Sequence, residues 1–444
     1  MNDDHYYDVR DDRLLRYPKA RRLDQARRIA ISASPDYLST YAGQVALLTA
    51  ANLLGRMARQ VTLAIPPTRI VAPLPWVGAD LATFALAQMQ AADPRGDYRC
   101  APAGDGDYPI HLGHSSTSVI THGAGWFAYH GPAPSPLSAD QSANPIGAAL
   151  AVVAMAARLA VSGFDAPPLP VTLNSNDWTD RIDDSAAPLP TAPALGDIWT
   201  VGTGSVGSAA LYFLSLATRD FEAVLFDGDK VKRENLTRSP IFIDDDIGAA
   251  KSDVTGTYLR SLGMKTVVAE PVALHESQRW AQRPIGTPDL VISAANEHNV
   301  RHLIESLFPP IQIYGTTGKN WQASVIRHLP LVDACSCCVF PEATHIPTAC
   351  ATDEEIAAST VKAPRIDASL PFLSFAAGLM TAAEVLKLQL SDYAMNPNRA
   401  ILYTRPDLRF AKARIPYRAN CLCATRSKGA HAQMIAGSRY AGSN

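Results

Sequence analysis

The sequence predicts an α/β protein of two related halves, each built round a mostly parallel sheet. Three observations support this prediction. Short apolar runs alternate with helix-like runs through the second half, which is typical of parallel strands joined by helices. The first half repeats part of that order. The length of 444 residues is sufficient for two or three domains with large cores.

The second half shows the alternation most clearly. In chain order we expect a strand that ends in a glycine turn (197–204), a helix (205–220), a strand (222–229), a helix (249–263), two more strands (265–272 and 288–295) and a long late helix (372–390). A stretch rich in proline and alanine precedes them and is expected to be a linker.

The composition fits a cytoplasmic globular protein. Hydrophobic residues make up 47% of the chain and charged residues 18%, and the net charge is −2. This balance does not indicate a nucleic-acid or membrane partner. The polar N-terminus does not resemble a signal peptide, and the apolar run from Ile146 is shorter than the ~20 residues that a membrane-spanning helix needs. We expect that run to form a buried helix.

A glycine-rich turn between a strand and a helix is the strongest local signal. Gly202, Gly204 and Gly207 fit the pattern G-x-G-x-x-G. In such a turn the first glycine allows a tight bend, the second lets phosphates approach the backbone, and the third lets the helix pack closely. The helix N-terminus also attracts an anion. Asp227 ends the next strand, where a carboxylate can accept hydrogen bonds from ribose hydroxyls.

These features alone suit a dinucleotide such as NAD as well as ATP. The residues that follow favour ATP. Asp229, Asn235 and Arg238 come after the strand, and Lys251 begins the next helix. Fixed cations stabilise the charge that develops during nucleotidyl transfer, whereas hydride transfer has no such need. The sequence therefore favours ATP-dependent chemistry supported by Arg238 and Lys251.

The first half resembles a copy of this plan that has lost the nucleotide site. Its helix-then-strand run, 43–67, is similar to 207–227, and the helix expected over 145–160 resembles the late helix. No glycine turn follows an apolar strand, and the strand ends in isoleucine and proline where the second half has Asp227. We therefore predict a degenerate domain beside an active one. Two unrelated α/β domains are the alternative.

The order of these motifs, over about residues 195–425, resembles the ThiF/MoeB family, which includes the activating domains of ubiquitin-activating enzymes. The resemblance implies two Rossmann-like adenylation-type domains that form a pseudodimer. It implies ATP and Mg²⁺ as cofactors, and adenylation of the C-terminal glycine of a small ubiquitin-like protein. By position, Gly204 would lie at the phosphates and Asp227 at the ribose. Asn235, Arg238 and Lys251 would surround the triphosphate.

One position departs from the family pattern. Where the family has an aspartate that helps to hold magnesium, this sequence has Asn296. Asparagine is a neutral oxygen ligand and a poorer partner for Mg²⁺. Glu297 or Asp229 would then contribute more to metal binding. A scaffold without catalytic activity is the alternative if the metal site is disabled.

Six of the seven cysteines lie late in the chain, which favours metal binding or thiol chemistry over a disulfide framework. Cys335 and Cys338 match the family's C-x-x-C run. Cys421 and Cys423, spaced C-x-C, would complete a structural Zn²⁺ site of four thiolates. Cys337 is an alternative ligand, and core cysteines without a metal are the other interpretation.

Cys350 lies beyond the C-x-x-C run, in a polar stretch of the kind that forms a mobile crossover loop in the family. Members that make a thioester place a cysteine here, because a thiolate can attack an acyl-adenylate and release AMP. We therefore predict that Cys350 is catalytic. An ordinary loop cysteine is the alternative.

Arg16 matches the first arginine of an N-terminal helix that, in the family, brings a cation to the site of a partner copy. The arginine that reaches the phosphates falls near Lys19, and Pro18 interrupts the match. Arg16 is thus a candidate catalytic residue. A plain basic helix is an equal alternative.

Together these features predict an ATP-dependent activating enzyme for a ubiquitin-like protein, which forms a thioester on Cys350 and passes the acyl group to a conjugating enzyme. A bacterial ubiquitin-like conjugation system of the kind found in phage-defence operons is the expected setting. Chains could also pair as homodimers. The expected divisions are 1–184 (degenerate domain), 185–196 (linker), 197–425 (active domain with the cysteines) and 426–444 (flexible tail).

Two other functions share part of this signal. A sulfur-carrier adenylyltransferase for cofactor or siderophore synthesis would share the chemistry up to the adenylate and differ afterwards. An NAD(P)-dependent oxidoreductase would share the glycine turn only, and Arg238 and Lys251 count against it.

Overall fold

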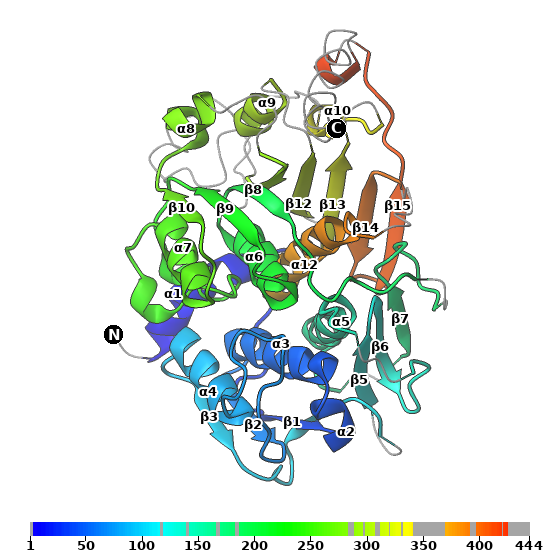
Figure 1. The fold of residues 1–444 in the computed structure, drawn as a ribbon. Helices are drawn as coiled ribbons and strands as arrows, with labels where there is room; N and C mark the ends of the chain where they lie inside the picture. The colour runs from blue at the N-terminus through cyan, green and yellow to red at the C-terminus, as the bar shows by residue number, and fades with distance from the viewer. Residues whose placement is uncertain are drawn as a thin grey trace.

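The computed structural model describes residues 3–115, 119–138, 142–165, 169–182, 186–282, 288–295, 298–306, 311–318, 320–329, 332–340, 369–390, 397–419 and 421–424. Two sheets form, one in each half of the chain, and helices of both halves lie between them (Figure 1).

The first half runs from the N-terminus to the proline-rich stretch. In order it contains α1 (Asp3–Leu15), β1 (Ile29–Ala33), α2 (Pro35–Leu38), α3 (Tyr41–Met57), β2 (Gln60–Ala64), α4 (Leu81–Ala92), β3 (Asp97–Cys100), β4 (Tyr108–Leu112), β5 (Val119–Ala124), β6 (Phe127–Pro132), α5 (Ile146–Ser162) and β7 (Val171–Asn174).

The second half carries the longer sheet. Its longer elements are β8 (Gly196–Val201), α6 (Ser205–Ala217), β9 (Phe221–Phe226), α7 (Lys251–Ser261), β10 (Val267–Glu270), α8 (Gln278–Ala281), β11 (Leu290–Ser293), α9 (His298–Ser306), β12 (Gln312–Gly318), β13 (Gln322–His328), α10 (Ser336–Val339), α12 (Pro371–Lys387), β14 (Arg399–Tyr403) and β15 (Arg409–Ala413). Four short 3-10 turns are η1 (Arg233–Asn235), η2 (Asp244–Asp246), η3 (Leu274–Glu276) and η4 (Leu422–Ala424).

The two sheets have the same topology. The first has the strand order β3-β2-β1-β4-β5-β6-β7, and the second has the order β10-β9-β8-β11-β12-β13-β14-β15. In each sheet the first five strands of that order are parallel and the sixth and seventh are antiparallel. The second sheet extends this pattern by one antiparallel strand, β15. The predicted α/β fold of two related Rossmann-like halves is confirmed.

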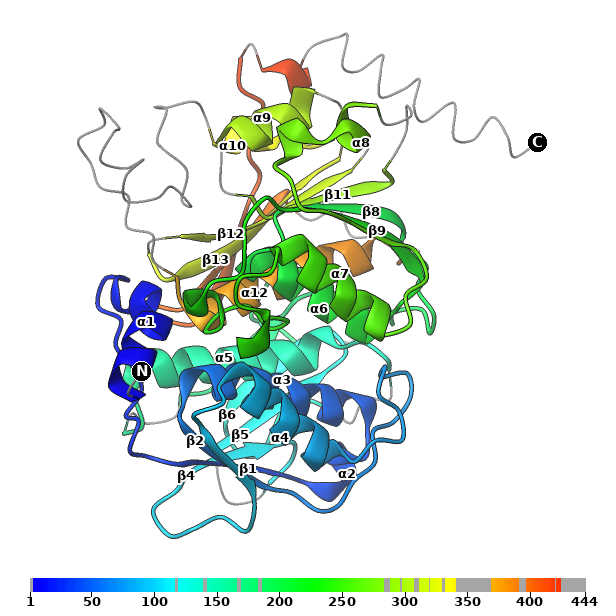
Figure 2. The same cartoon turned by 90° about the vertical axis from the view of Figure 1, so that its left-hand side faces the viewer.

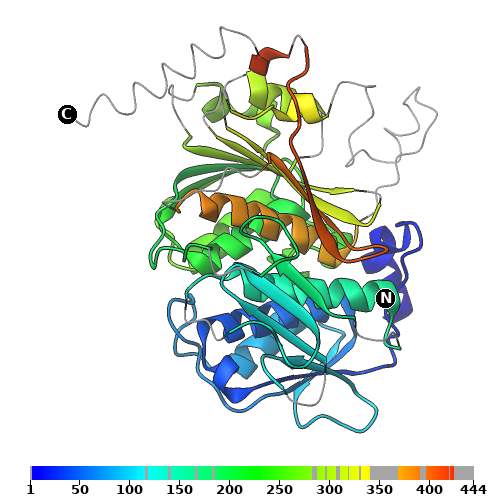
Figure 3. The ribbon, with the colours of Figure 1, turned by 90° about the vertical axis from the view of Figure 1, so that its right-hand side faces the viewer.

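The halves pack through their helices. A layer of α6, α7 and α12 faces a layer of α3, α4 and α5, with one sheet outside each layer (Figure 2). The buried apolar side chains of both layers form a single cluster, so the halves share one core. At one edge β15 meets β7, where the backbone N–H of Phe410 donates to Asp180 at 3.1 Å (Figure 3).

The expected elements of the second half are all present, with ends that differ by a few residues. The apolar run from Ile146 lies wholly within the buried helix α5, as predicted. The proline-rich stretch differs from a solvated linker, because Leu189 and Leu195 are buried and Trp126 Nε1 donates to the carbonyl of Ala187 at 3.0 Å. Among the described residues no helix is long and apolar enough to cross a membrane.

Candidate active site

The glycine turn lies where the strand order of the second sheet reverses, between β8 and its neighbours β9 and β11. Gly202 has a φ of 85°, a left-handed conformation that favours glycine. A Cβ added to Gly202 would come 3.0 Å from the backbone nitrogen of Ala295, because β11 ends directly beside the turn. The bend is therefore tight on both conformational and steric grounds.

The other two glycines of the turn differ in their surroundings. A Cβ on Gly207 would come 2.0 Å from the carbonyl oxygen of Gly202, so this glycine lets α6 pack against the turn. A Cβ on Gly204 would have no described heavy atom within 4 Å. Gly204 caps α6, whose first N–H groups have no partner within the helix. The turn thus presents an open backbone surface at a helix N-terminus, which suits an anion.

The carboxylate of Asp227 stabilises the glycine turn through hydrogen bonds. One oxygen accepts the backbone N–H of Thr203 at 2.7 Å, and the other accepts the backbone N–H of Asp229 at 2.9 Å. Burial raises the pKa of Asp227, while nearby Lys251 acts to lower it. The sequence predicted Asp227 as the last residue of its strand, and in the structure Asp227 directly follows β9. Its hydrogen bonds to the turn were not anticipated, and its contact with a ribose stays a prediction.

An ion pair joins Asp229 to the start of α7. Lys251 Nζ lies 2.6 Å from Asp229 Oδ2, and Lys251 is only 7% exposed. The backbone N–H of Lys251 also donates to the carbonyl of Asp229 at 2.9 Å. The structure therefore connects Thr203, Asp227, Asp229 and Lys251 in one network beside the glycine turn.

The segment 230–250 connects β9 to α7 and carries the other two predicted residues. Asn235 and Arg238 are buried there, at 6% and 5% exposure. Asn235 Oδ1 accepts the backbone N–H of Lys232 at 2.8 Å, and Arg238 Nη1 donates to the carbonyl of Glu234 at 2.6 Å. These bonds fold the segment back on itself, so a second buried cation lies on the same loop that ends at Lys251.

The N-terminal helix α1 reaches this segment from the first half (Figure 1). Arg13, on the last turn of α1, lies 3.4 Å from the carboxylate of Glu234. Arg16 lies just beyond α1, is largely exposed, and pairs with Asp12 at 2.9 Å. The helix that contacts the candidate site is thus the one that the sequence indicated. Arg13 was not named, although it lies one turn before Arg16 in the same basic run.

Four cysteines form a cluster at the outer end of the second half. The sulfur atoms of Cys335, Cys338, Cys421 and Cys423 all lie within 4.8 Å of one another. A tetrahedral Zn²⁺ with Zn–S bonds of about 2.3 Å would need sulfur separations of about 3.8 Å. The Cys335 and Cys338 sulfur atoms lie 3.8 Å apart, which is compatible with that geometry. Cys337 instead lies 3.6 Å from His302 Nδ1. The cysteine set predicted from the sequence is therefore brought together.

Two predicted residues cannot be placed. Asn296 and Cys350 both lie outside the described residues. Their proposed roles in magnesium binding and thioester formation stay predictions.

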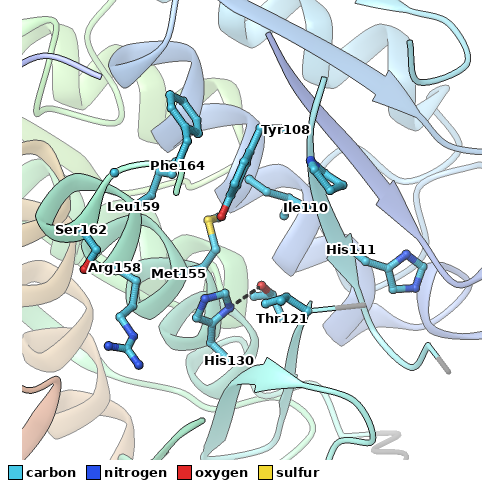
Figure 4. A pocket seen from close by; sticks show the side chains of 13 residues that line it. Tyr108, Ile110, His111, Thr121, His130, Met155, Arg158, Leu159, Ser162 and Phe164 are labelled. Carbon is cyan, nitrogen blue, oxygen red and sulfur yellow. Dashed lines mark hydrogen bonds between the residues drawn. The ribbon is translucent and has the colours of Figure 1, made fainter. Parts of the chain in front are cut away.

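A cavity of about 340 Å³ in the first half is separate from these features (Figure 4). It lies between β4, β5, β6 and the C-terminal end of α5, whereas the counterpart of the glycine turn follows β1. His130 bonds to Thr121 at 3.1 Å, and Arg158 donates to the carbonyl of Leu169 at 2.7 Å. Burial lowers the pKa of His130 to about 4, so its ring is neutral at pH 7. The cavity is not a remnant of a nucleotide site.

Family comparison identifies the class of protein. A model of the ThiF family matches residues 196–425, just over half of the chain. The chain belongs to the ThiF family of adenylating enzymes, as its motifs predicted. A model of the BilD N-terminal domain matches residues 28–164, which cover most of the first half.

Individual proteins extend the comparison. The SAMP-activating enzyme E1 of Haloferax volcanii is 27% identical over 233 residues, which cover 52% of this chain and 79% of the relative. Among solved structures, E. coli MccB is similar with a TM-score of 0.40 at 16% identity. The match to its complex with MccA-N7isoASN covers 52% of this chain and 67% of that one, and the match to MccB with ATP covers 52% and 66%.

Proposed function

We propose that this protein activates a ubiquitin-like protein with ATP. The second half would adenylate the carrier's C-terminal glycine, and Cys350 would take the acyl group as a thioester before a conjugating enzyme receives it. The observation that supports this most is the pair of buried cations, Arg238 on the segment 230–250 that leaves β9 and Lys251 at the start of α7. The similarity to an archaeal enzyme named as SAMP-activating E1 favours a small protein as the substrate.

The first step is an attack of a carrier carboxylate oxygen on the α-phosphorus of ATP. A new C–O–P bond forms, the bond from the α-phosphorus to the bridging oxygen breaks, and pyrophosphate leaves. Negative charge grows on the α-phosphate and on the leaving group, so preorganised cations lower the barrier. Arg238 and Lys251 would supply them, and the N–H groups at the start of α6 would bind a phosphate.

The second step is an attack of the Cys350 thiolate on the acyl carbon of the adenylate. The thioester bond forms, the mixed anhydride bond breaks, and AMP leaves with the electron pair. The thiol proton must be lost to solvent or to a nearby base first, since only the thiolate is nucleophilic.

Bound Mg²⁺ would neutralise triphosphate charge in this site. Carboxylate oxygens are its usual protein ligands. Asp229 fits this role among the described residues, because its side chain is 42% exposed beside the turn and one oxygen pairs with Lys251. Zn²⁺ would have a structural role in the cysteine cluster, where four thiolates leave no open coordination position.

We further propose that residues 1–184 are a degenerate adenylation domain and that residues 197–425 are the active one. In the first half α2 and the residues around it replace the glycine turn. A Cβ on Gly43 would come 1.9 Å from the carbonyl oxygen of Tyr37, which matches the close contact of Gly207. Tyr37 Oη also donates to the carbonyl of Gly123 at 2.8 Å. Tyr37 would thus fill space that a nucleotide needs.

The cation that relatives take from a partner copy would come from α1 of the same chain. Arg13 is the better placed candidate, because it pairs with Glu234 on the segment that carries Arg238. Arg16 would need to leave Asp12 and turn towards the site. A pseudodimer within one chain would make a homodimer unnecessary for this contact.

Calorimetric titration tests the nucleotide first. The purified protein should bind ATP with Mg²⁺ and should not bind NADH. Small proteins encoded beside its gene are then tested as carriers by ATP–pyrophosphate exchange. Carrier-dependent exchange supports the proposal, whereas NADH binding without ATP binding would overturn it. Exchange without any later thiol adduct would favour a sulfur-carrier adenylyltransferase.

A further inference from the structure

Two polar residues on α3, in the first half, form hydrogen bonds with the segment 233–242 of the second half. Asn52 and Arg56 lie one helical turn apart and are both buried, at 4% and 3% exposure. Neither was indicated by the sequence, because in a helix such residues usually face solvent. Their partners lie about 180 residues further along the chain.

The guanidinium of Arg56 binds three backbone carbonyl oxygens of this segment. Nη1 donates to Leu236 and, at 3.0 Å, to Phe242, and Nη2 donates to Pro240 at 3.0 Å. Asn52 completes the arrangement. Its oxygen accepts from Arg56 Nε at 2.8 Å, and its Nδ2 donates to Pro240 at 3.1 Å. One planar cation therefore binds the carbonyls of Leu236, Pro240 and Phe242 at the same time.

These hydrogen bonds satisfy carbonyl oxygens of the segment. Buried carbonyl oxygens must be hydrogen-bonded, and η1 is too short to satisfy those that follow it. The acceptors of these Arg56 hydrogen bonds are all neutral oxygens, so burying the charge of Arg56 is costly unless each donor is used. Burial lowers the pKa of Arg56 to about 9, so its guanidinium stays protonated at neutral pH. Such an arrangement is stable only when the halves are packed together.

We propose that Arg56 is a positioning residue for the nucleotide segment, so that the degenerate half sets the geometry of Asn235 and Arg238 in the active half. Leu236 directly follows Asn235, and Pro240 and Phe242 follow Arg238. A shift of these carbonyls would displace both side chains. This inference rests on the proposed adenylation function.

Contacts from α1 support the same view. Tyr6 Oη donates to Asp244 at 3.2 Å, and Arg233 lies over the Tyr6 ring at 4.6 Å from its centre. Arg13 pairs with Glu234. The first half therefore contacts the segment 233–246 from both α1 and α3, and Arg56 alone donates three of these hydrogen bonds.

Tyr41 provides a matched control on the same helix. Its hydroxyl donates to the carbonyl of Leu216 at 2.8 Å, which is also a buried hydrogen bond between the halves. Leu216 lies at the C-terminal end of α6, away from the nucleotide segment. Tyr41→Phe thus removes an interface hydrogen bond without touching residues 233–242.

The experiment compares wild type, Arg56→Met, Arg56→Lys, Asn52→Ala and Tyr41→Phe. Binding of a non-hydrolysable ATP analogue is measured by calorimetry, KM and kcat by pyrophosphate exchange, and amide hydrogen exchange of 233–242 by mass spectrometry without nucleotide. Arg56→Met should weaken analogue binding about tenfold or more, since one lost charged hydrogen bond to a buried group has that magnitude. Asn52→Ala should have a smaller effect, and the amides of 233–242 should exchange faster in both.

Tyr41→Phe should change none of these values beyond a small loss of thermal stability. Equal effects in Tyr41→Phe and the Arg56 variants would overturn the inference, because Arg56 would then only hold the halves together. Unchanged exchange and binding in Arg56→Lys and Asn52→Ala would also overturn it if Arg56→Met fails to fold. Hydrogen exchange needs no ATP, so wild-type protein that does not bind ATP would contradict the proposed function separately.

Discussion

Lys251 Nζ lies 2.6 Å from Asp229 Oδ2, and the backbone N–H of Lys251 donates to the carbonyl of Asp229 at 2.9 Å. This double contact fixes the first residue of α7 against the start of the segment that leaves β9. The ammonium is buried next to Asp227, which in turn holds the glycine turn through Thr203. A cation held in this way is preorganised for an incoming triphosphate.

Lys251→Ala should therefore slow adenylate formation much more than it lowers stability. Removing one preorganised charge contact costs about 3 kcal/mol at the transition state, or about a hundredfold in rate. Pyrophosphate exchange measures the rate, and thermal unfolding measures stability. Lys230→Ala is the control, because Lys230 is exposed on the same segment and should keep the wild-type rate. Equal rates for both variants would remove Lys251 from the mechanism.

Two glycines of the turn should respond differently to the same substitution. Gly207→Ala should destabilise the fold by about 1–3 kcal/mol, because its Cβ would lie 2.0 Å from the carbonyl oxygen of Gly202. Gly204→Ala should leave the melting temperature nearly unchanged, since no described atom lies within 4 Å of the new methyl group. It should still weaken ATP binding, because that open side is where phosphates would approach. A stable Gly204→Ala variant with unchanged ATP affinity would place the phosphates elsewhere.

The order of strands and helices along the second half and the glycine turn were predictable because their signals are local. Alternation of apolar runs and the spacing of three glycines depend on neighbours in the chain. The same holds for the cysteines, whose C-x-x-C and C-x-C pairs each lie within a short turn.

Contacts between the halves were not predictable in this way. Arg56 and Leu236 are separated by 180 positions, and nothing beside Arg56 indicates that its guanidinium will be buried. Arg13 was missed for a similar reason, since which arginine of α1 meets Glu234 depends on how the helix is rotated against the second half. Leu189 and Leu195 are likewise buried in the core that both halves share, although proline and alanine around them suggest a solvated linker.

Zinc should copurify with the protein at about one ion per chain, held by the four-cysteine cluster. Cys335→Ser should lower the melting temperature markedly, because a structural zinc site contributes folding free energy directly. Cys100→Ser is the control, since Cys100 is exposed in the first half and distant in sequence from the cluster. Metal content is measured by mass spectrometry and stability by thermal unfolding. A metal-free preparation as stable as the zinc-loaded one would show that these cysteines only pack together.

Asp197 should make the stability depend on pH. Burial, with Asp289 and Glu222 nearby, raises its pKa from 3.8 to about 6, although Trp199 Nε1 donates to it at 3.1 Å. A raised carboxyl pKa means that the folded state binds the proton more tightly, so stability falls as pH rises from about 4 to 6. Since the group is only half-buried, screening reduces the full shift to about 1 kcal/mol.

Asp197→Asn keeps an acceptor for Trp199 and removes this charge, so it should raise the melting temperature at pH 7.5 and change it little at pH 4. Glu222 is exposed nearby, so Glu222→Gln should change the melting temperature at pH 7.5 less than Asp197→Asn does. Thermal unfolding at both pH values provides the test. An Asp197→Asn variant that is less stable at pH 7.5 would show that the carboxylate is favourably paired there.

Cys350→Ala separates the two chemical steps of the proposed reaction. Adenylation needs no thiol, so the variant should still release pyrophosphate when ATP and the carrier are present. It should form no thioester, because the acyl group then has no nucleophile. Cys350 also needs a lowered thiol pKa, which neighbouring cations or a helix end can supply, whereas the acidic residues that follow it in sequence oppose ionisation.

Wild type and variant are compared on a non-reducing gel, with Cys337→Ala as the control. A reducer-sensitive adduct that persists in Cys350→Ala would assign the acyl group to another cysteine, and wild-type protein that accumulates adenylate without any adduct would exclude the thioester step.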